Sequence, residues 1–279
     1  MSQLALDSSP ATQRVAVRRH GLVVRVTHWV NALAWIFLLM SGLQIFNAHP
    51  ALYWGRQSNF PQPFLSMTAS NQDPTRGVTW IAGHPFDTTG WFGVSKDENG
   101  QPEQRGFPRF MTWPGEQDLA TGRRWHFFFA WLFAINGAIY LLAGIVSRHL
   151  ARDLWPSWSD LRDLPRSVWE HVRLHFPRER HYNVLQKLAY ASTALVALPL
   201  MVLTGLTMSP AMDAAFPWLL EVFGGRQSAR SIHFITATFL VLFVVVHVVM
   251  VLISGVFNNL RSMITGRYLI EEEAHDPPR

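Results

Sequence analysis

One apolar run near the carboxyl end of the chain, RSIHFITATFLVLFVVVHVVMVLISGVF (230–257), contains two histidines, His233 and His247. The run is long enough to cross a bilayer as an α-helix, where an ionisable side chain is costly and usually functional. The fourteen steps between the histidines rise about 21 Å and complete about four turns, so both imidazoles lie on one face. The run therefore predicts a transmembrane helix that presents two ligand groups, one near each membrane surface.

The composition of the chain is that of a membrane protein. Of 279 residues, 49% are hydrophobic and 15% are charged, whereas soluble domains carry about 25% charged residues. Cysteine is absent, which excludes disulfides, thiolate-bound iron–sulfur clusters, zinc–thiolate sites and thioether-attached haem. The net charge of +5 comes from arginines that flank the apolar runs, so it predicts membrane topology and not a nucleic-acid partner.

Apolar stretches predict an all-α membrane protein, a bundle of four transmembrane helices with a long loop between the first and second helices. The spans are expected at about 27–46, 124–146, 184–208 and 230–255. The flanking segments are an amino-terminal tail (about 1–26), a first loop (about 47–123), a second loop (about 147–183) and a carboxyl-terminal tail (about 256–279). Together, residues of about 27–255 form the expected membrane domain.

The distribution of arginine predicts the direction of the spans. The amino-terminal tail, the second loop and the carboxyl-terminal tail are rich in arginine, and such segments stay in the cytoplasm. Both termini are therefore expected in the cytoplasm, and the first loop in the periplasm of a bacterial inner membrane. The first 25 residues lack a short apolar core, which predicts a retained tail and not a cleaved signal. Within the second loop, segment 158–176 is either an amphipathic surface helix, which Pro165 would interrupt, or a solvated connector.

Four histidines lie within the expected spans: His28, His126, His233 and His247. With the deduced direction they sort by depth into two pairs, His126 with His233 on the outer side and His28 with His247 on the inner side. Two haems, each held by two imidazoles, suit this arrangement, and such ligation favours electron transfer because no iron position stays open. Hydrogen-bonded interhelical histidines or a proton relay are the alternative. His49 competes with His126 as an outer ligand, and His149 is the competitor at the inner end of the second span.

Glycines and arginines near these histidines allow two interpretations each. Gly42, Gly137 and Gly144 return to the histidine faces of their helices, which suits a flat macrocycle but also ordinary small-residue helix packing. The arginines expected near haem propionates are Arg123, Arg124 and Arg230 on the outer side and Arg25 on the inner side. Charge-assisted pairing favours this role, and snorkelling of arginine at the end of a span is the alternative.

Three motifs together resemble a known superfamily. The first span, RVTHWVNALAWIFLLMSGLQI, resembles the first helix of bacterial cytochrome b561 and nickel–iron hydrogenase cytochrome b, and HYNVLQKLAY resembles a segment of hydrogenase cytochrome b and formate dehydrogenase gamma subunits. The two-histidine helix completes the pattern, and the resemblance covers about 18–268. It implies a four-helix bundle with two b haems whose iron ligands, by position, are His28, His126, His233 and His247.

The resemblance also implies a redox relay between a periplasmic catalytic subunit and membrane quinone. It places the quinone site beside the inner haem, at Asn183 and more weakly at Gln186, although Asn183 also suits a helix N-cap. The long first loop, with Trp54, Trp80 and other tryptophans, is similar to cytochromes paired with molybdopterin enzymes or described as thiosulfate reductase cytochrome b. Such a loop is expected to dock the partner or to cover the outer haem.

The leading functional hypothesis is a diheme cytochrome b subunit that transfers electrons between a periplasmic oxidoreductase, molybdopterin-dependent or hydrogenase-like, and the quinone pool. Whether the chain itself catalyses a reaction beyond quinone exchange stays open. One alternative is a stand-alone superoxide:quinone oxidoreductase with the same two haems. A haem-free transporter or proton channel that uses the same histidines is the other.

Overall fold

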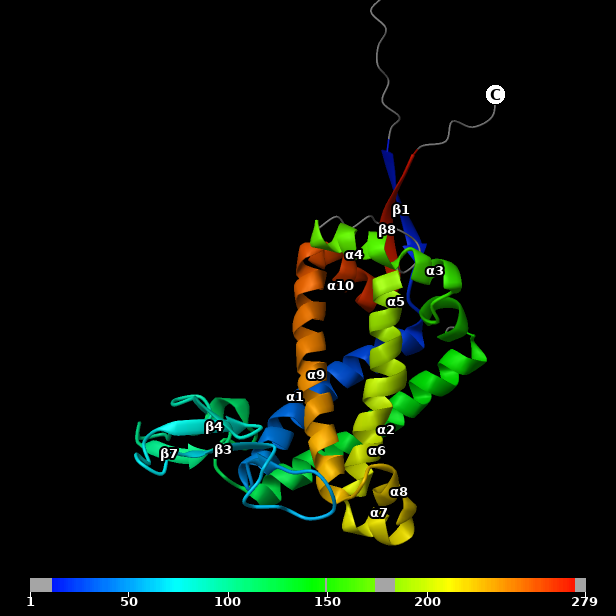
Figure 1. The fold of residues 1–279 in the computed structure, drawn as a ribbon. Coiled ribbons are helices and arrows are strands. Elements are labelled where there is room, and N and C mark those ends of the chain that lie inside the picture. The colour runs from blue at the N-terminus through cyan, green and yellow to red at the C-terminus, as the bar shows by residue number, and fades with distance from the viewer. Residues whose placement is uncertain (1–11, 149, 174–183, 274–279) are drawn as a thin grey trace, which may run out of the picture. The chain divides into compact units, whose positions relative to one another are not determined.

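The computed structural model describes residues 12–148, 150–173 and 184–273. Within these residues, four helical segments are long and apolar enough to cross a membrane, as the sequence predicts. They are the helices α1 (Leu22–Asn47), α2 (Leu119–Val146), the continuous segment α5 (Val184–Ala191), η3 (Ser192–Ala197) and α6 (Leu198–Thr207), and α9 (Arg226–Ile253) (Figure 1). The η3 stretch is a π-helix that ends two residues before Pro199. Proline lacks an N–H group and crowds the preceding turn, so a local change of helical register accommodates it.

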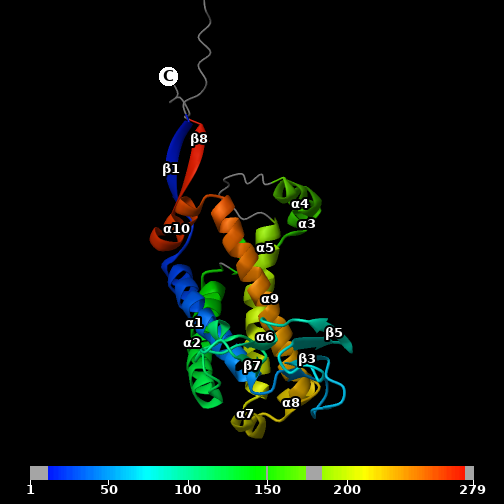
Figure 2. The same ribbon diagram turned by 90° about the vertical axis from the view of Figure 1, so that its left-hand side faces the viewer.

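The chain forms two compact units. Unit 1 comprises the described residues of 1–26, 142–191 and 244–279, and unit 2 comprises 27–141 and 192–243. In unit 1, strand β1 (Thr12–Arg18) pairs antiparallel with β8 (Arg267–Glu273), with Arg18 opposite Arg267 (Figure 2). The described parts of the two tails therefore lie side by side. Their cytoplasmic location stays a prediction.

The described residues of the second loop, in unit 1, form short helices. It holds η2 (Leu150–Leu154), α3 (Trp158–Arg162) and α4 (Leu164–Val172), and α10 (Val256–Thr265) follows α9. Ser157 and Asp160 form a capping box that starts α3, since each side chain pairs with the backbone N–H of the other residue. Pro165 is the second residue of α4, so the predicted interruption separates α3 from α4. Trp158 and Trp169 are exposed, as expected for surface helices.

The first loop, in unit 2, folds into strands and short helical turns. The strands are β2 (Ala51–Leu52), β3 (Leu65–Ala69), β4 (Gly77–Ile81), β5 (His84–Asp87), β6 (Gly93–Lys96) and β7 (Pro102–Arg105), followed by the 3-10 turn η1 (Arg109–Met111). Strands β2–β5 form an antiparallel sheet in chain order, and β6 pairs with β7. This corrects the all-α prediction, because the chain is predominantly helical with a β-rich loop.

The third loop holds α7 (Pro210–Ala215) and α8 (Trp218–Val222).

Two glycines let β6 approach the sheet closely. Gly93 has a φ of 83°, and a Cβ atom there would lie 2.4 Å from the carbonyl oxygen of Thr68. At Gly77 a Cβ atom would lie 2.2 Å from the carbonyl oxygen of Phe92. Any larger residue would push the backbones apart. Beneath this contact, Leu52, Met67 and Phe107 of the loop pack against Phe46 of α1 in one buried cluster.

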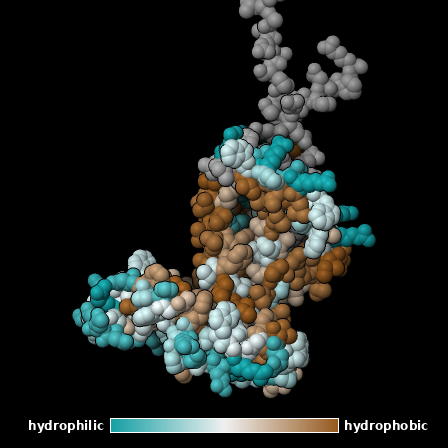
Figure 3. Space-filling view, in the orientation of Figure 1, coloured by the Kyte–Doolittle hydropathy of each residue, from teal (hydrophilic) through white to brown (hydrophobic). Residues whose placement is uncertain are grey.

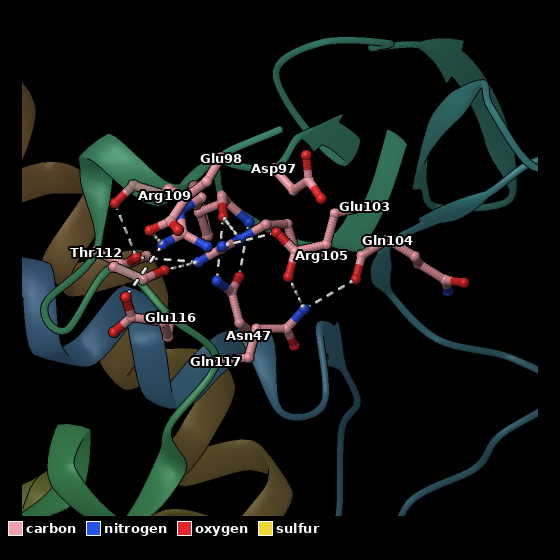
Figure 4. Close-up of polar contacts among 12 residues, drawn as sticks. Asn47, Asp97, Glu98, Glu103, Gln104, Arg105, Arg109, Thr112, Glu116 and Gln117 are labelled. Carbon is pink, nitrogen blue, oxygen red and sulfur yellow. Dashed lines mark hydrogen bonds and ion pairs between the residues drawn. The ribbon is translucent and has the colours of Figure 1, made fainter. Parts of the chain in front are cut away.

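A buried arginine connects distant parts of the loop, and Asn47 joins the loop to the end of α1. The side chain of Arg105 is fully buried and donates to the carbonyl oxygens of Phe107 and Gly115, at 2.7 and 3.1 Å. It also contacts the hydroxyl of Thr112 at 3.0 Å and the carboxylate of Glu103 at 3.1 Å (Figure 4). Asn47, the last residue of α1, makes two hydrogen bonds with the backbone of Phe107. These contacts give the loop a defined position on unit 2.

The surfaces of the helices and of the loop differ in polarity. In unit 2, apolar side chains gather over the helices and hydrophilic ones over strands β3–β7 (Figure 3). Along α2, Phe128 is 65% exposed and Ile135 is 58% exposed, with Trp131 and Ile139 exposed between and beyond them. A water-soluble helix would turn such an apolar stripe toward a core. The stripe is therefore the surface expected to face lipid.

Candidate functional site

The structure brings together His126 of α2 and His233 of α9, the pair expected on the outer side. Their ring centres lie 6.4 Å apart, with the ring planes at 63°. Both side chains are partly buried and come from neighbouring long helices of unit 2. When one nitrogen of each of two imidazoles binds a common metal at about 2 Å, the ring centres lie about 6 Å apart. The observed separation therefore suits two ligands of one metal ion.

Each of these histidines is held by a hydroxyl group from another helix. The Nδ1 atom of His126 lies 3.1 Å from the Oγ atom of Ser41 on α1. The Nδ1 atom of His233 lies 2.9 Å from the Oγ1 atom of Thr204 on α6. A metal-binding imidazole commonly uses its second nitrogen in this way, because the hydrogen bond fixes the orientation of the ring. These two residues were not identified from the sequence, where serine and threonine are common in membrane helices.

A glycine follows each of the two hydroxyl residues and lies against the same imidazole. A Cβ atom at Gly42 would lie 3.3 Å from Cε1 of His126, and one at Gly205 would lie 3.5 Å from Cε1 of His233. Gly42 of α1 therefore lies beside a histidine of the expected outer pair. A Cβ atom at Gly137 would have no neighbour within 4 Å, and one at Gly144 would meet the side chain of Leu150. Gly144 thus fits the alternative role in helix packing.

The donor set is a pair of imidazoles without further metal-binding groups. Among the residues that the structure describes, no three histidine, aspartate, glutamate or cysteine side chains are placed to hold one metal ion. Structural zinc sites need four ligands and catalytic ones three from the protein. Two imidazoles suffice for haem iron, because the porphyrin provides the other four nitrogens. The pair and its two glycines therefore fit a haem better than a bare ion.

Comparison with known proteins identifies the family of the chain. The family model of the prokaryotic cytochrome b561 matches residues 19–266. The chain belongs to this family. It is a multi-pass cytochrome b561-family membrane protein, and the family implies a b-type haem.

One curated relative is a protein of Azospira oryzae, YedZ1, named as a candidate protein-methionine-sulfoxide reductase subunit. The two sequences are 31% identical over 252 residues, which cover 88% of this chain and 96% of the relative. No solved structure matches the chain. The relatedness to the Azospira protein therefore extends over nearly its whole length.

The predicted inner ligands of this cytochrome b561-family protein, His28 and His247, lie on α1 and α9. The ring centre of His28 lies 5.3 Å from that of Trp29, edge to face. His28 belongs to unit 2 and His247 to unit 1, so their pairing stays a prediction. Asn183 and His149 lie outside the described residues. Gln186 lies in α5, in unit 1.

His49 is engaged apart from the outer pair. Its Nε2 atom lies 3.1 Å from the hydroxyl of Tyr53, and the two rings stack at 5.6 Å. Partial burial, together with the nearby charge of Arg230, lowers the pKa of His49. The structure thus places His126, and not His49, beside His233.

The arginines of this cytochrome have protein partners in the structure. Arg230 donates to the backbone carbonyls of His49 and Ala51. Arg25 donates to the carbonyl of Ile264 at 2.9 Å, and Arg124 contacts the hydroxyl of Thr121 at 2.9 Å. Arg123 lies over the ring of Phe127. Their predicted role at haem propionates stays a prediction, and for Arg230 the structure shows a second role in holding the loop.

Proposed function

We propose that this protein is a diheme cytochrome b subunit that transfers electrons between a periplasmic oxidoreductase and membrane quinone. The single observation that carries the proposal is the 6.4 Å separation of the His126 and His233 rings in a membrane helix bundle. Membership of the prokaryotic cytochrome b561 family supports it. The matched relative is named as a reductase subunit, which supports a role inside a larger enzyme.

The proposal assigns the predicted histidines to two haems and two polar residues to quinone. His126 and His233 would hold the outer haem, and His28 and His247 would hold the inner one. A b haem with two imidazole ligands supplies reversible one-electron transfer and leaves no iron position for substrate. The helices hold the imidazoles at different depths, and their apolar side chains keep water from the ligands. Asn183 and Gln186 are proposed to bind quinone near the inner haem.

The partner is proposed to be a periplasmic catalytic subunit of the methionine sulfoxide reductase type, as the name of the relative indicates. A molybdopterin enzyme would suit this role, and a reductase would draw electrons from quinol. The β-rich loop is proposed to lie in the periplasm and to dock this partner. Its strands, its apolar cluster and the buried Arg105 give it the defined shape that a docking surface needs. A hydrogenase-like partner is the second class that the resemblance allows.

The first experiment tests the haem ligands. The protein is purified from native membranes, and haem content is measured by visible spectroscopy for the variants H126A, H233A, H28A and H247A. H126A and H233A are expected to lose the same half of the haem, and H28A and H247A the other half. The matched control is H49A, which removes a histidine near the outer end of α1 and should retain both haems. Loss of different haems in H126A and H233A, or haem loss in H49A, would contradict the proposed ligands.

The second experiment tests the electron path. Membranes that contain the protein are supplied with a quinol analogue, and reduction of the haem is followed with and without the co-purified periplasmic protein and methionine sulfoxide. Reoxidation that needs both additions supports the proposal. A partnerless protein whose haem reacts with superoxide would support the stand-alone superoxide:quinone oxidoreductase instead. A colourless protein would support a haem-free transporter.

A further inference from the structure

Two short segments of the chain repeat the same local arrangement. LMSGL (39–43) lies on α1 and VLTGL (202–206) lies on α6, and each places a hydroxyl residue and a glycine against a histidine of the outer pair. We infer that Ser41 and Thr204 are positioning residues that fix one tautomer of His126 and His233 and make Nε2 the metal-binding nitrogen of both. The inference rests on the proposed function, because it assumes that the pair holds a haem.

The position of the hydroxyl hydrogen follows from the distances. The Oγ atom of Ser41 lies 2.5 Å from the carbonyl oxygen of Phe37, one turn earlier in α1. A carbonyl oxygen only accepts, so the single hydrogen of the hydroxyl points at Phe37. The lone pairs of Ser41 then remain for Nδ1 of His126, at 3.1 Å. His126 must therefore donate, which requires a hydrogen on Nδ1.

The second copy shows the same arrangement. The Oγ1 atom of Thr204 lies 2.6 Å from the carbonyl oxygen of Leu200, and 2.9 Å from Nδ1 of His233. The hydroxyl hydrogen is again directed at the helix carbonyl, so His233 also donates from Nδ1. A neutral imidazole with a hydrogen on Nδ1 has its lone pair on Nε2. Both rings of the outer pair are thus prepared to bind a metal through the same atom.

The chemical nature of the partner determines its electronic effect. A hydroxyl acceptor strengthens the imidazole as a ligand moderately, whereas a carboxylate acceptor would give it anionic character. A stronger ligand stabilises oxidised iron and lowers the reduction potential. Removing the hydroxyl should therefore weaken the ligand and raise the potential of the outer haem. The potential is a readout that a purely structural role of the hydroxyl would not move in this direction.

The test is a redox titration of the purified full-length protein, followed at the visible bands of the haem that H126A and H233A remove. Thr204→Val removes the hydroxyl but keeps the branched shape, and Thr204→Ser keeps the hydroxyl. The matched control is Thr207→Val, since Thr207 is equally buried on the same helix and its hydroxyl donates to the carbonyl of Thr204 at 2.6 Å. A raised potential in Thr204→Val and Ser41→Ala, with wild-type values in Thr204→Ser and Thr207→Val, supports the inference.

Two outcomes would overturn it. One is a Thr204→Val potential equal to that of Thr207→Val. The other is haem loss in Thr204→Ser as well as in Thr204→Val, which would show that packing and not the hydroxyl matters. If Thr204→Val loses the haem and Thr204→Ser retains it, the comparison of the two variants still supports the role of the hydroxyl. If Thr204→Val shifts the potential of the outer haem but the protein exchanges no electrons with quinone or partner, only the proposed function is contradicted. If the potential is unchanged and electron exchange is complete, only this inference is contradicted.

Discussion

The guanidinium group of Arg230 donates to the backbone carbonyl of Ala51 at 3.0 Å, although the two residues lie in distant parts of the chain. One residue later, the hydroxyl of Ser231 donates to the carbonyl of Tyr53 at 2.6 Å. The hydroxyl of Ser228 accepts from the backbone N–H of Gly55 at 2.7 Å. The first turns of α9, which precede His233, thus hold the chain that enters the β-rich loop.

Replacing Arg230 should therefore loosen the loop. In Arg230→Gln the carbonyls of His49 and Ala51 lose a charged donor, and a buried unpaired polar group costs about 1–3 kcal/mol. We expect faster cleavage of the 49–56 segment in limited proteolysis of the purified protein. Arg226→Gln is the control, because Arg226 pairs with Asp213 of the third loop and not with this segment. A haem loss without faster cleavage would indicate that the propionate role predominates.

The two glycines beside the histidines should respond differently to alanine. At Gly42 the added Cβ atom would lie 3.3 Å from His126, closer than most real contacts, whereas at Gly205 the distance of 3.5 Å to His233 is an ordinary contact. Alanine also favours a helix by about 1 kcal/mol over glycine. Gly205→Ala should therefore keep the wild-type haem spectrum. Its thermal stability should equal that of the wild type or be slightly higher. Gly42→Ala should shift the bands or potential of the outer haem, and identical behaviour of the two variants would contradict the assigned contacts.

The buried guanidinium of Arg105 should be essential for the loop. Four groups of the loop depend on it, and removing one partner of a buried charged network commonly costs about 3–5 kcal/mol. Arg105→Gln is expected to make segment 93–118 susceptible to protease, as measured by mass spectrometry of the fragments. The control Arg109→Gln removes a partly exposed guanidinium that pairs with Glu98 and Glu116. It should change cleavage little, and equal sensitivity of both variants would argue against a special role of burial.

The spans could be predicted from the sequence because lipid imposes a simple pattern. A helix that satisfies its own backbone and exposes apolar side chains must be long and apolar, and all four such segments appear in the structure. The expectation that His126 and His233 lie together followed from the same geometry, since rise per residue converts sequence position into height, and their ring centres lie 6.4 Å apart.

The loop and the hydroxyl residues could not be predicted in the same way. Strands β3–β7 are only four or five residues long, and they depend on pairing with one another and on close approach at Gly77 and Gly93. Such short segments lack a periodicity long enough to read. For Ser41 and Thr204, the sequence shows a hydroxyl in an apolar helix but not the helix that it faces. The charge of Arg230 is evident from the sequence, but its hydrogen-bond partners are not, because these backbone carbonyls lie 179 and 181 positions away in the chain.

Acid should weaken the α3 region of unit 1 through Asp160. The ammonium group of Lys187, 2.8 Å away, together with the backbone and hydroxyl of Ser157, lowers the pKa of Asp160 to about 2. Because the folded pKa lies below the unfolded value of about 3.9, the contribution to stability is complete above about pH 4 and is lost as the pH falls through about 2.

Asp160→Asn tests this contribution at neutral and at acidic pH. At pH 7 it should reduce the protection of residues 157–162 in hydrogen exchange by about 1 kcal/mol, the size of a lost capping interaction. Between pH 5 and pH 3, about the range in which the carboxylate begins to protonate in the unfolded state, the wild type should lose protection while the variant changes less. Asp163→Asn removes a carboxylate at the end of the same short helix but keeps the Lys187 contact, so it should retain the wild-type pH dependence. An Asp160→Asn profile parallel to the wild type would show that another group titrates in this range.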